Sequence, residues 1–253
     1  MSKAPAVDYA LEIIEFFATE KSELGIADIS KSLGINKNAV SRVLEALLEK
    51  NWIYLSDKVQ KKYSLTMHSF SLIVGHSKNN DIVKIATPFI EKLNAQFGDA
   101  VCLGIKKDKN VLYLIHCDST KDVRINGCVG GEYPLNCSAP GKVLLSNSEN
   151  YEILDYFSEA VDKRTDNTIV DYNAFIKEVD KIKKLGYAVD DEEFAKGIIC
   201  IAVPIFDYEN NVVASICISS LTMYDSIETL IDEKLPMLKK SADEISLCLG
   251  KKN

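Results

Sequence analysis

The sequence has no apolar run long enough to cross a lipid bilayer. Its longest run, residues 198–206, has nine residues and includes Pro204, whereas a membrane-spanning helix needs about 20 apolar residues. The first residues also lack the succession of charged, apolar and small-residue segments that marks a secretory signal. We therefore expect a cytoplasmic protein that has no membrane partner.

Histidine, tryptophan and paired cysteine motifs are also scarce. The 253 residues include three His, one Trp and seven Cys, and no two cysteines form a CxxC pair. An odd number of scattered cysteines predicts reduced thiols rather than a disulfide framework. Apolar residues make up 47% and charged residues 26%, which excludes a disordered or fibrous chain, and the length predicts about two domains.

Positive charge is in deficit overall, since the net formal charge is −7, but it is concentrated in one segment. Residues 31–62 carry seven Lys and Arg against three Asp and Glu. A local basic surface on an acidic protein can bind phosphate groups, while the acidic remainder limits non-specific adhesion.

The basic segment lies within a pattern typical of a winged helix-turn-helix domain, which we place at residues 1–66. Apolar residues at three-and-four spacing predict helices over 7–17, 26–33 and 36–50, with Gly34 ending the second helix and Asn36 capping the third. Residues 52–55 and 62–65 predict a hairpin behind them. The alternative is a three-helix bundle with a hairpin that binds protein.

The third predicted helix carries polar side chains on the side away from its leucines. Asn can pair with adenine and Arg with guanine through two hydrogen bonds each, and Ser and Lys can reach bases or phosphates. We therefore predict contact with a palindromic operator in double-stranded DNA. The alternative for each exposed lysine is a solvated surface charge. The predicted DNA-binding residues are Lys37, Asn38, Ser41 and Arg42 on the helix and Lys58, Lys61 and Lys62 in the wing.

The rest of the chain predicts a linker helix over 67–80 and an α+β domain over 81–253. Helices are expected at 82–97, 141–146, 151–157, 172–185 and 225–248, although Pro88 and Pro236 interrupt two of them. Extended segments are expected at 100–106, 111–117, 124–133, 187–189, 198–206 and 212–219. Their mixed order, with several hairpins, indicates an antiparallel sheet.

Two stretches of this second domain, PLNCSAPGKVLLS at 134–146 and GYAVDDEEFAKGIICIAVPIFDYENNVVASICISS at 186–220, resemble the effector-domain signatures of the IclR family of bacterial transcription regulators. Residues 63–66 resemble that family's second wing strand. The resemblance implies a dimeric or tetrameric DNA-binding regulator. It also implies a GAF-like domain that binds a small organic effector, often a carboxylate.

The resemblance also implies an effector pocket, with residues carried over by their position in the two motifs. Three departures favour a more apolar ligand: Asn136 stands where His is common, Pro140 has no N–H to donate, and Cys217 stands where Ser is frequent. The implied effector-binding residues are Ser138, Ala139, Pro140, Gly141, Asp190, Cys200, Cys217 and Ser219.

Two other functions are alternatives for the same region. Three thiols and a carboxylate could hold a tetrahedral zinc ion or sense thiol chemistry, from Cys137, Asp190, Cys200 and Cys217. A cysteine-dependent enzyme is the more remote alternative, because none of the three histidines, His68, His76 and His116, lies in either motif. We expect no catalytic residue and no cofactor.

Overall fold

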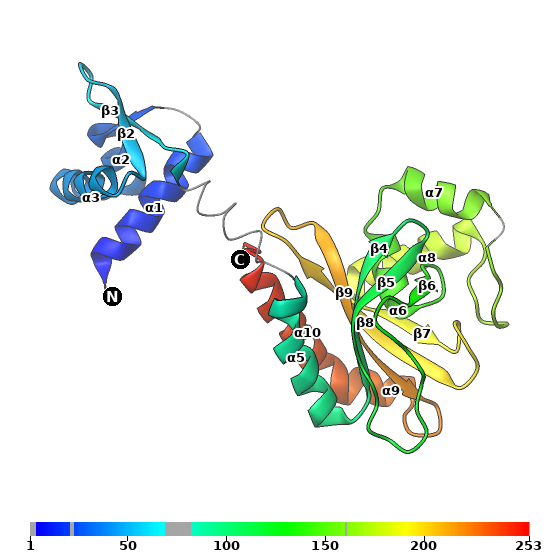
Figure 1. Cartoon of the computed structure of the whole chain (residues 1–253). Coiled ribbons are helices and arrows are strands. Elements are labelled where there is room, and N and C mark those ends of the chain that lie inside the picture. Colours follow the sequence, from blue (N-terminus) through cyan, green and yellow to red (C-terminus); the bar gives the residue numbers. More distant parts are fainter. Residues whose placement is uncertain (1–3, 21–22, 69–81, 160, 253) are drawn as a thin grey trace. The chain divides into compact units, whose positions relative to one another are not determined.

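The computed structural model describes residues 4–20, 23–68, 82–159 and 161–252, and the chain divides into two compact units at residues 1–80 and 81–253 (Figure 1). The linker helix predicted over 67–80 lies almost entirely outside the described residues. Among the described residues, no helix combines the length and the apolar character needed to cross a membrane.

The first unit is a three-helix domain with a small sheet. Its elements are α1 (Pro5–Glu20), β1 (Leu24–Gly25), α2 (Ile26–Leu33), α3 (Lys37–Glu49), β2 (Ile53–Asp57) and β3 (Lys62–Leu65). The sheet has the order β1-β3-β2 and is antiparallel. The two-residue strand β1 was not predicted, because it is too short to show a period.

Local signals in the sequence set the tight turn between α2 and α3. Gly34 ends α2 with φ 68°, in the left-handed region that favours glycine. The Asn36 side chain then accepts a hydrogen bond of 2.8 Å from the backbone N–H of Asn38, which caps α3. The apolar faces of the helices meet in a core that includes Ile13, Ile29, Val40, Leu44 and Ile53, all no more than 2% exposed.

The second unit is built on one six-stranded antiparallel sheet with the order β6-β5-β4-β9-β8-β7. Its strands are β4 (Ala100–Lys107), β5 (Asn110–Cys117), β6 (Glu132–Pro134), β7 (Ala188–Asp191), β8 (Ile198–Phe206) and β9 (Val212–Leu221). The helices are α5 (Ile82–Phe97), α6 (Ala139–Ser146), α7 (Asn150–Ser158), α8 (Tyr172–Leu185), α9 (Ile227–Thr229) and α10 (Leu235–Cys248). Figure 1 shows α5 and α10 side by side.

Two apolar cores lie on the two faces of this sheet. On one face, Ile90 of α5 and Leu238 of α10 pack against strand residues such as Ile216. On the other, Val143 of α6 and Phe175 of α8 pack together with small residues of the same strands. Side chains alternate between the faces of a strand, so each central strand contributes to both cores. The predicted α+β class with an antiparallel sheet is confirmed.

The structure corrects two of the predicted elements. Within the extended segment predicted over 124–133, only the end is a strand, β6; the glycines at 127, 130 and 131 disfavour a continuous strand. The last predicted helix is divided into α9, a π-helical turn at Leu230–Lys234 and α10. Pro236 stands in the first turn of α10, where its missing N–H is not needed.

Candidate functional site

The first candidate site is the outer face of α3. Val40, Leu44 and Leu47 bury one side of this helix, and Lys37 and Arg42 are exposed on the remaining surface. Asn38 is also exposed, and half-buried Ser41 donates a hydrogen bond of 3.3 Å to Glu45 Oε1. All four predicted DNA-contacting positions of the helix therefore lie outside its apolar face.

The hairpin carries the predicted wing lysines at its turn. Lys58 and Lys61 are exposed and Lys62 is half-buried at the start of β3. Asp57 shapes the turn by accepting hydrogen bonds from the N–H groups of Val59 and Gln60, at 2.7 and 2.9 Å. Within the described parts of the chain, no ion pair engages these lysines or the cations of α3, so their charges are available to phosphates.

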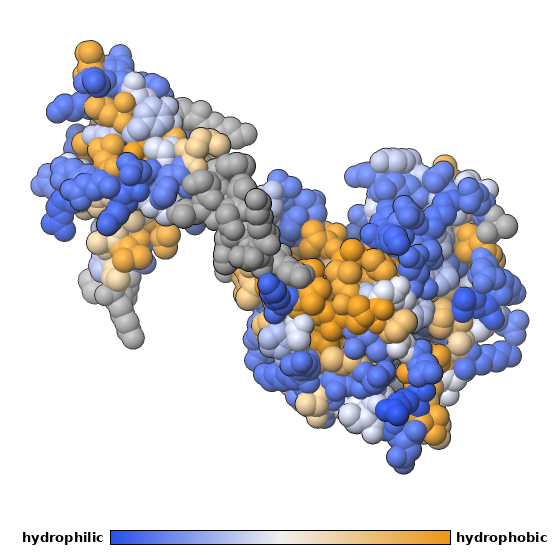
Figure 2. All heavy atoms as spheres, in the orientation of Figure 1, coloured by the Kyte–Doolittle hydropathy of each residue, from blue (hydrophilic) through white to orange (hydrophobic). Residues whose placement is uncertain are grey.

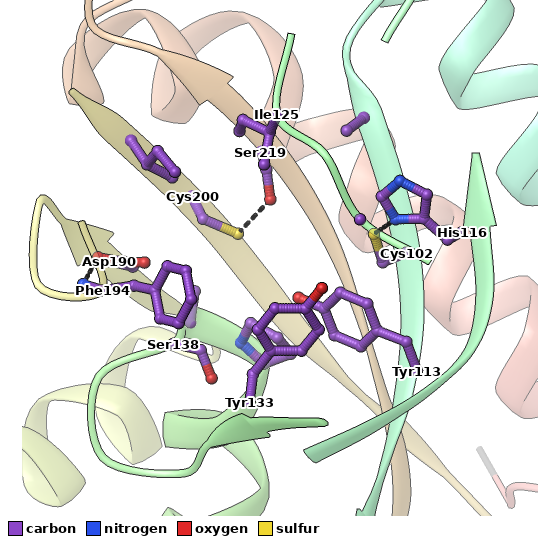
Figure 3. A pocket seen from close by; sticks show the side chains of 15 residues that line it. Cys102, Tyr113, His116, Ile125, Tyr133, Ser138, Asp190, Phe194, Cys200 and Ser219 are labelled. Carbon is purple, nitrogen blue, oxygen red and sulfur yellow. Dashed lines mark hydrogen bonds between the residues drawn. The ribbon is translucent and has the colours of Figure 1, made fainter. Parts of the chain in front are cut away.

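The second candidate site is a pocket in the second unit, on the sheet face that α6 covers (Figure 3). It provides about 40 Å³ of room for small molecules, which corresponds to roughly three waters. Its wall is formed by residues of all six strands, the start of α6 and the loops after β5 and β7. The lining residues are Ala100, Cys102, Tyr113, His116, Ile125, Gly127, Tyr133, Ser138, Ala139, Pro140, Asp190, Phe194, Ile198, Cys200 and Ser219.

Six of the eight residues implied by the resemblance line this pocket: Ser138, Ala139, Pro140, Asp190, Cys200 and Ser219. The other two lie beside it. A Cβ atom on Gly141 would stand 2.6 Å from Leu135 Cα, so this glycine allows close backbone packing. Cys217 is fully buried next to the wall.

Sequence reasoning missed the aromatic part of the wall. The ring centroids of Tyr113 and Tyr133 are 4.5 Å apart, and those of Tyr133 and Phe194 are 5.5 Å apart in an edge-to-face arrangement with an interplanar angle of 68°. Sequence reasoning also missed Cys102 and His116, which both line the pocket (Figure 3). These residues come from separate strands and loops, and only the strand order brings them together.

Asp190 is the one carboxylate among the lining residues, and none of these residues is Lys or Arg. The carboxylate is 2% exposed, and its Oδ1 accepts hydrogen bonds from the N–H groups of Glu193 and Phe194, at 2.8 and 3.2 Å. Burial, with the charge of Glu193 next, raises the pKa of Asp190 to about 7. The group therefore changes its charge near neutral pH and can either accept or donate a proton to a ligand.

A buried ion cluster lies next to Asp190. The Lys142 ammonium, from α6, is 2.5 Å from Glu193 Oε1 and 3.0 Å from Glu178 Oε1. Burial alone would lower the pKa of Lys142, but the two glutamates outweigh it and raise that pKa. The cluster ties α6 to α8 and to the loop after β7, and so fixes two sides of the pocket.

Three thiols gather on the sheet beside the pocket. Cys102 of β4 stands directly opposite Cys217 of β9, and Cys200 of β8 is opposite Ser219. The Ser219 hydroxyl donates to Cys200 Sγ at 3.1 Å, and Cys102 Sγ lies 2.9 Å from His116 Nδ1 (Figure 3).

The structure corrects the zinc hypothesis. Among the described residues, no group of three or more His, Cys, Asp or Glu side chains is placed to hold a metal ion. The proposed set of Cys137, Asp190, Cys200 and Cys217 therefore does not converge: the first lies in the loop before α6 and the others on strands. His116 lies outside both sequence motifs, as stated above, yet β5 pairs with β4 and thereby places it at the pocket wall.

Two family models match the chain once its sequence is compared with known families. The model for the IclR helix-turn-helix domain matches residues 6–56. The model for the bacterial transcriptional regulator IclR C-terminal domain matches residues 75–247, which is more than half of the chain.

Individual relatives agree with the models. The HTH-type transcriptional regulator KdgR of Escherichia coli (strain K12) is 31% identical over 232 residues, which make up 91% of this chain and 88% of that protein. The structure of the repressor BlcR of Agobacterium tumefaciens has a TM-score of 0.81 at 22% identity over all of both chains, which shows a common fold. The structure of the IclR protein of Thermotoga maritima has a TM-score of 0.64 at 27% identity and covers 96% of this chain and 98% of that one.

Proposed function

Because this chain belongs to the IclR family of bacterial transcriptional regulators, we propose that it binds a palindromic operator as a homodimer or homotetramer and that a small organic effector switches this binding. The chain is a transcriptional regulator with a helix-turn-helix DNA-binding domain and a C-terminal effector-binding domain; it is not an enzyme. We place it in the cytoplasm, with access to the chromosome.

One observation supports the DNA-binding surface above others: the outer face of α3 is polar and its cations are not engaged in ion pairs with the described residues. In a two-fold dimer, two such helices enter successive major grooves, so the half-sites lie about 34 Å apart or at a multiple of that spacing. Lys58, Lys61 and Lys62 of the wing would then neutralise phosphates beside the groove, in a manner that weakens with salt.

The effector is proposed to occupy the pocket between the sheet and the start of α6. The pocket's aromatic and thiol lining favours a small ligand with an apolar body, and Ser138, Ser219 and Asp190 supply polar contacts. A ligand switches the protein only if it binds more tightly to one arrangement of the subunits than to the other. We assign residues 1–66 to DNA binding, 67–80 to the linker and 81–253 to a GAF-like domain for effector binding and oligomerisation.

An incompletely covered sheet face supports oligomerisation. Figure 2 shows apolar side chains gathered on the second unit over the central strands of its sheet. Ile105 and Leu114 belong to the core on the α5 and α10 side, yet both are only half-buried. Contiguous exposed apolar surface of this kind is typical of contact with another protein, and we propose a second copy of the chain as that partner.

Selection from a random pool of DNA duplexes tests the DNA-binding proposal directly. The full-length chain should enrich an inverted repeat, and the double variant Asn38→Ala, Arg42→Ala should enrich no sequence. A variant of an exposed lysine in the second unit, Lys163→Ala, serves as the matched control and should select the same repeat. Enrichment without two-fold symmetry, or an unchanged selection by the α3 variant, would contradict the proposed mode of binding.

The effector proposal needs a separate measurement. Small carboxylic acids, amines and neutral carbonyl compounds can be screened for their effect on the affinity of the chain for the selected duplex. A true effector should lose its influence in the variant Ser219→Ala, which removes a hydroxyl from the pocket wall, while that variant still binds DNA in the ligand-free state. An effector that works equally well on this variant acts at another site.

A further inference from the structure

Three of the seven cysteines, Cys102, Cys200 and Cys217, share one face of the sheet and one buried cluster. Cys102 of β4 and Cys217 of β9 are directly opposite on neighbouring antiparallel strands. Cys200 of β8 is opposite Ser219, which is two residues along β9 from Cys217. All three side chains are buried in the same cluster on the α6 side of the sheet, each no more than 3% exposed. The Tyr113 hydroxyl lies 4.0 Å from the Cys217 sulfur. The proposed effector switch uses these thiols only as apolar lining and leaves their redox chemistry unused.

One member of this cluster also contacts a base. Cys102 Sγ lies 2.9 Å from His116 Nδ1, and His116 Nε2 lies 3.0 Å from Asp118 Oδ1. The carboxylate orients the imidazole ring, and the ring nitrogen beside the thiol can take its proton. Gly127 lies closely against the ring, since a Cβ atom at this position would stand 2.2 Å from His116 Cε1.

The cluster is reached through the pocket. Cys102, Cys200 and His116 line it, and its room of about 40 Å³ accommodates hydrogen peroxide. A small oxidant that enters the pocket therefore meets the Cys102 sulfur beside the imidazole of His116.

We propose that Cys102 and Cys217 form a disulfide when hydrogen peroxide enters the pocket. His116 takes the proton of Cys102, the thiolate attacks one peroxide oxygen, and the O–O bond breaks. Cys102 becomes a sulfenic acid, and the departing hydroxide leaves as water with the proton from His116. The Cys217 thiol then attacks the Cys102 sulfur, and the second oxygen leaves as water with the Cys217 proton. In sum, two thiols and one peroxide give one disulfide and two waters.

The geometry permits the second step with little strand movement. Directly opposed residues on antiparallel strands have Cβ atoms about 4.5–5.5 Å apart, and a disulfide requires about 3.5–4.5 Å. Burial raises the pKa of the Cys102 thiol, so the resting group is protonated and needs the imidazole to react. Cys128 and Cys248, which are exposed, have no such base in contact among the described residues.

The new bond would alter the pocket. It removes the contact of Cys102 with His116 and that of Cys217 with Tyr113, and both His116 and Tyr113 line the wall. The regulatory meaning of this change rests on the proposed effector function, because a remodelled pocket matters only if a ligand uses it. The chemistry itself does not depend on that function.

Mass spectrometry of the reduced, full-length protein treated with stoichiometric hydrogen peroxide tests the proposal. The intact mass should fall by two hydrogens, and a proteolytic digest should yield one peptide pair linked through Cys102 and Cys217. Cys217→Ser should stop at a gain of one oxygen on Cys102, trapped by a sulfenic-acid reagent, and Cys102→Ser should show neither product. The matched controls Cys128→Ser and Cys248→Ser should form the linked pair at the normal rate.

The rate at which Cys102 is oxidised tests the role of His116 as the base. His116→Ala should slow the oxidation of Cys102 by about 100-fold at neutral pH and should make the rate rise with pH, because the thiol must then ionise unaided. Gly127→Ala, which displaces the ring, should act in the same direction. A linked pair that excludes Cys102, or oxidation at the normal rate in His116→Ala, would overturn the proposal. These readouts are masses, so a failure of the chain to bind an operator would leave them unaffected and would count only against the proposed function.

Discussion

Lys142 and Glu193 form an ion pair whose two charged groups are both buried, with the lysine side chain 1% and the glutamate side chain 9% exposed. Glu178 adds a second carboxylate, whose Oε1 lies 3.0 Å from the Lys142 ammonium. With all three groups ionised, one cation faces two anions. Within the described residues, Glu193 Oε2 has no hydrogen-bond partner, and burial raises the pKa of Glu193. Lys142 therefore supplies the positive charge that both glutamates contact.

Replacing the lysine should destabilise the second unit strongly. Lys142→Met removes the cation and leaves Glu193 without an ion-pair partner among the described residues, while Glu178 keeps only its 3.7 Å pair with Lys181. Breaking a buried pair in this way costs about 3–5 kcal/mol. Lys107→Met is the matched control, since its ion pair with Glu132 is exposed and such pairs contribute about 0–1 kcal/mol. Thermal unfolding followed by calorimetry measures both, and similar midpoints for the two variants would refute this account of Lys142.

The raised pKa of Asp190 makes stability depend on pH. Below its ordinary value of 3.8 the carboxyl is neutral in both the folded and the unfolded chain. Between that value and about 7 the unfolded chain ionises first, so the free energy of unfolding falls as pH rises, by up to about 4 kcal/mol. The effect is complete above pH 7.

Asp190→Asn should remove most of this pH dependence. The amide carbonyl can still accept the hydrogen bonds from the N–H groups of Glu193 and Phe194, and it does not ionise. Denaturant titrations at several pH values between 4 and 8 check the change in slope. Asp225 does not interfere in this range, because its pKa is lowered to about 2 and its contribution is already complete above the ordinary value. An unaltered slope in the variant would place the ionisation elsewhere.

The helix and the wing should contribute to DNA binding in different ways. Arg42→Ala, on α3, should weaken binding to the selected operator by about 1–3 kcal/mol and relax the preference at one base pair. Lys58→Ala, in the exposed turn, should weaken binding to all duplexes alike and reduce the salt slope by about one ion. Fluorescence anisotropy at several salt concentrations separates the two effects, and a wing variant that changes base preference would contradict this division.

Local signals predicted most of the fold. The three-and-four spacing located α1, α2 and α3, and the capping roles of Gly34 and Asn36 depend on neighbouring residues alone. The antiparallel hairpin of β8 and β9 was also evident from its apolar runs and its polar turn. Such features are readable because their physical cause lies within a few residues of the chain.

The residues of the pocket are brought together by pairing between strands that are distant in the sequence. The contact of Cys102 with Cys217 follows from the register of β4 against β9, and that of Cys102 with His116 from the pairing of β4 with β5. A single sequence does not reveal these registers. The burial of Lys142 was missed for the same reason, since its partners Glu178 and Glu193 lie on α8 and in the loop after β7. Motif resemblance located most of the implied pocket residues, but not its aromatic wall.

Two glycines should respond differently to the same substitution. Gly34 has φ 68° and open space where a Cβ atom would stand, so Gly34→Ala should cost about 1 kcal/mol from backbone strain alone. Gly141 has no such strain, but a Cβ atom there would stand 2.6 Å from Leu135 Cα and 2.8 Å from Leu135 O. Backbone atoms cannot move aside as a flexible side chain can. Gly141→Ala must therefore displace the loop around Leu135 that precedes α6.

We expect Gly141→Ala to lower the stability of the second unit by about 1–3 kcal/mol, the usual cost of overpacking. It should also weaken effector binding, because Ser138 and Pro140, at the start of α6, line the pocket and would shift with the displaced loop. Gly34→Ala should leave effector binding unchanged and lower only the stability of the first unit. Hydrogen exchange resolves the two units separately, because each amide reports the opening of its own region. If Gly141→Ala left exchange in α6 and the affinity for the effector unchanged, the close packing on Leu135 would not control the pocket.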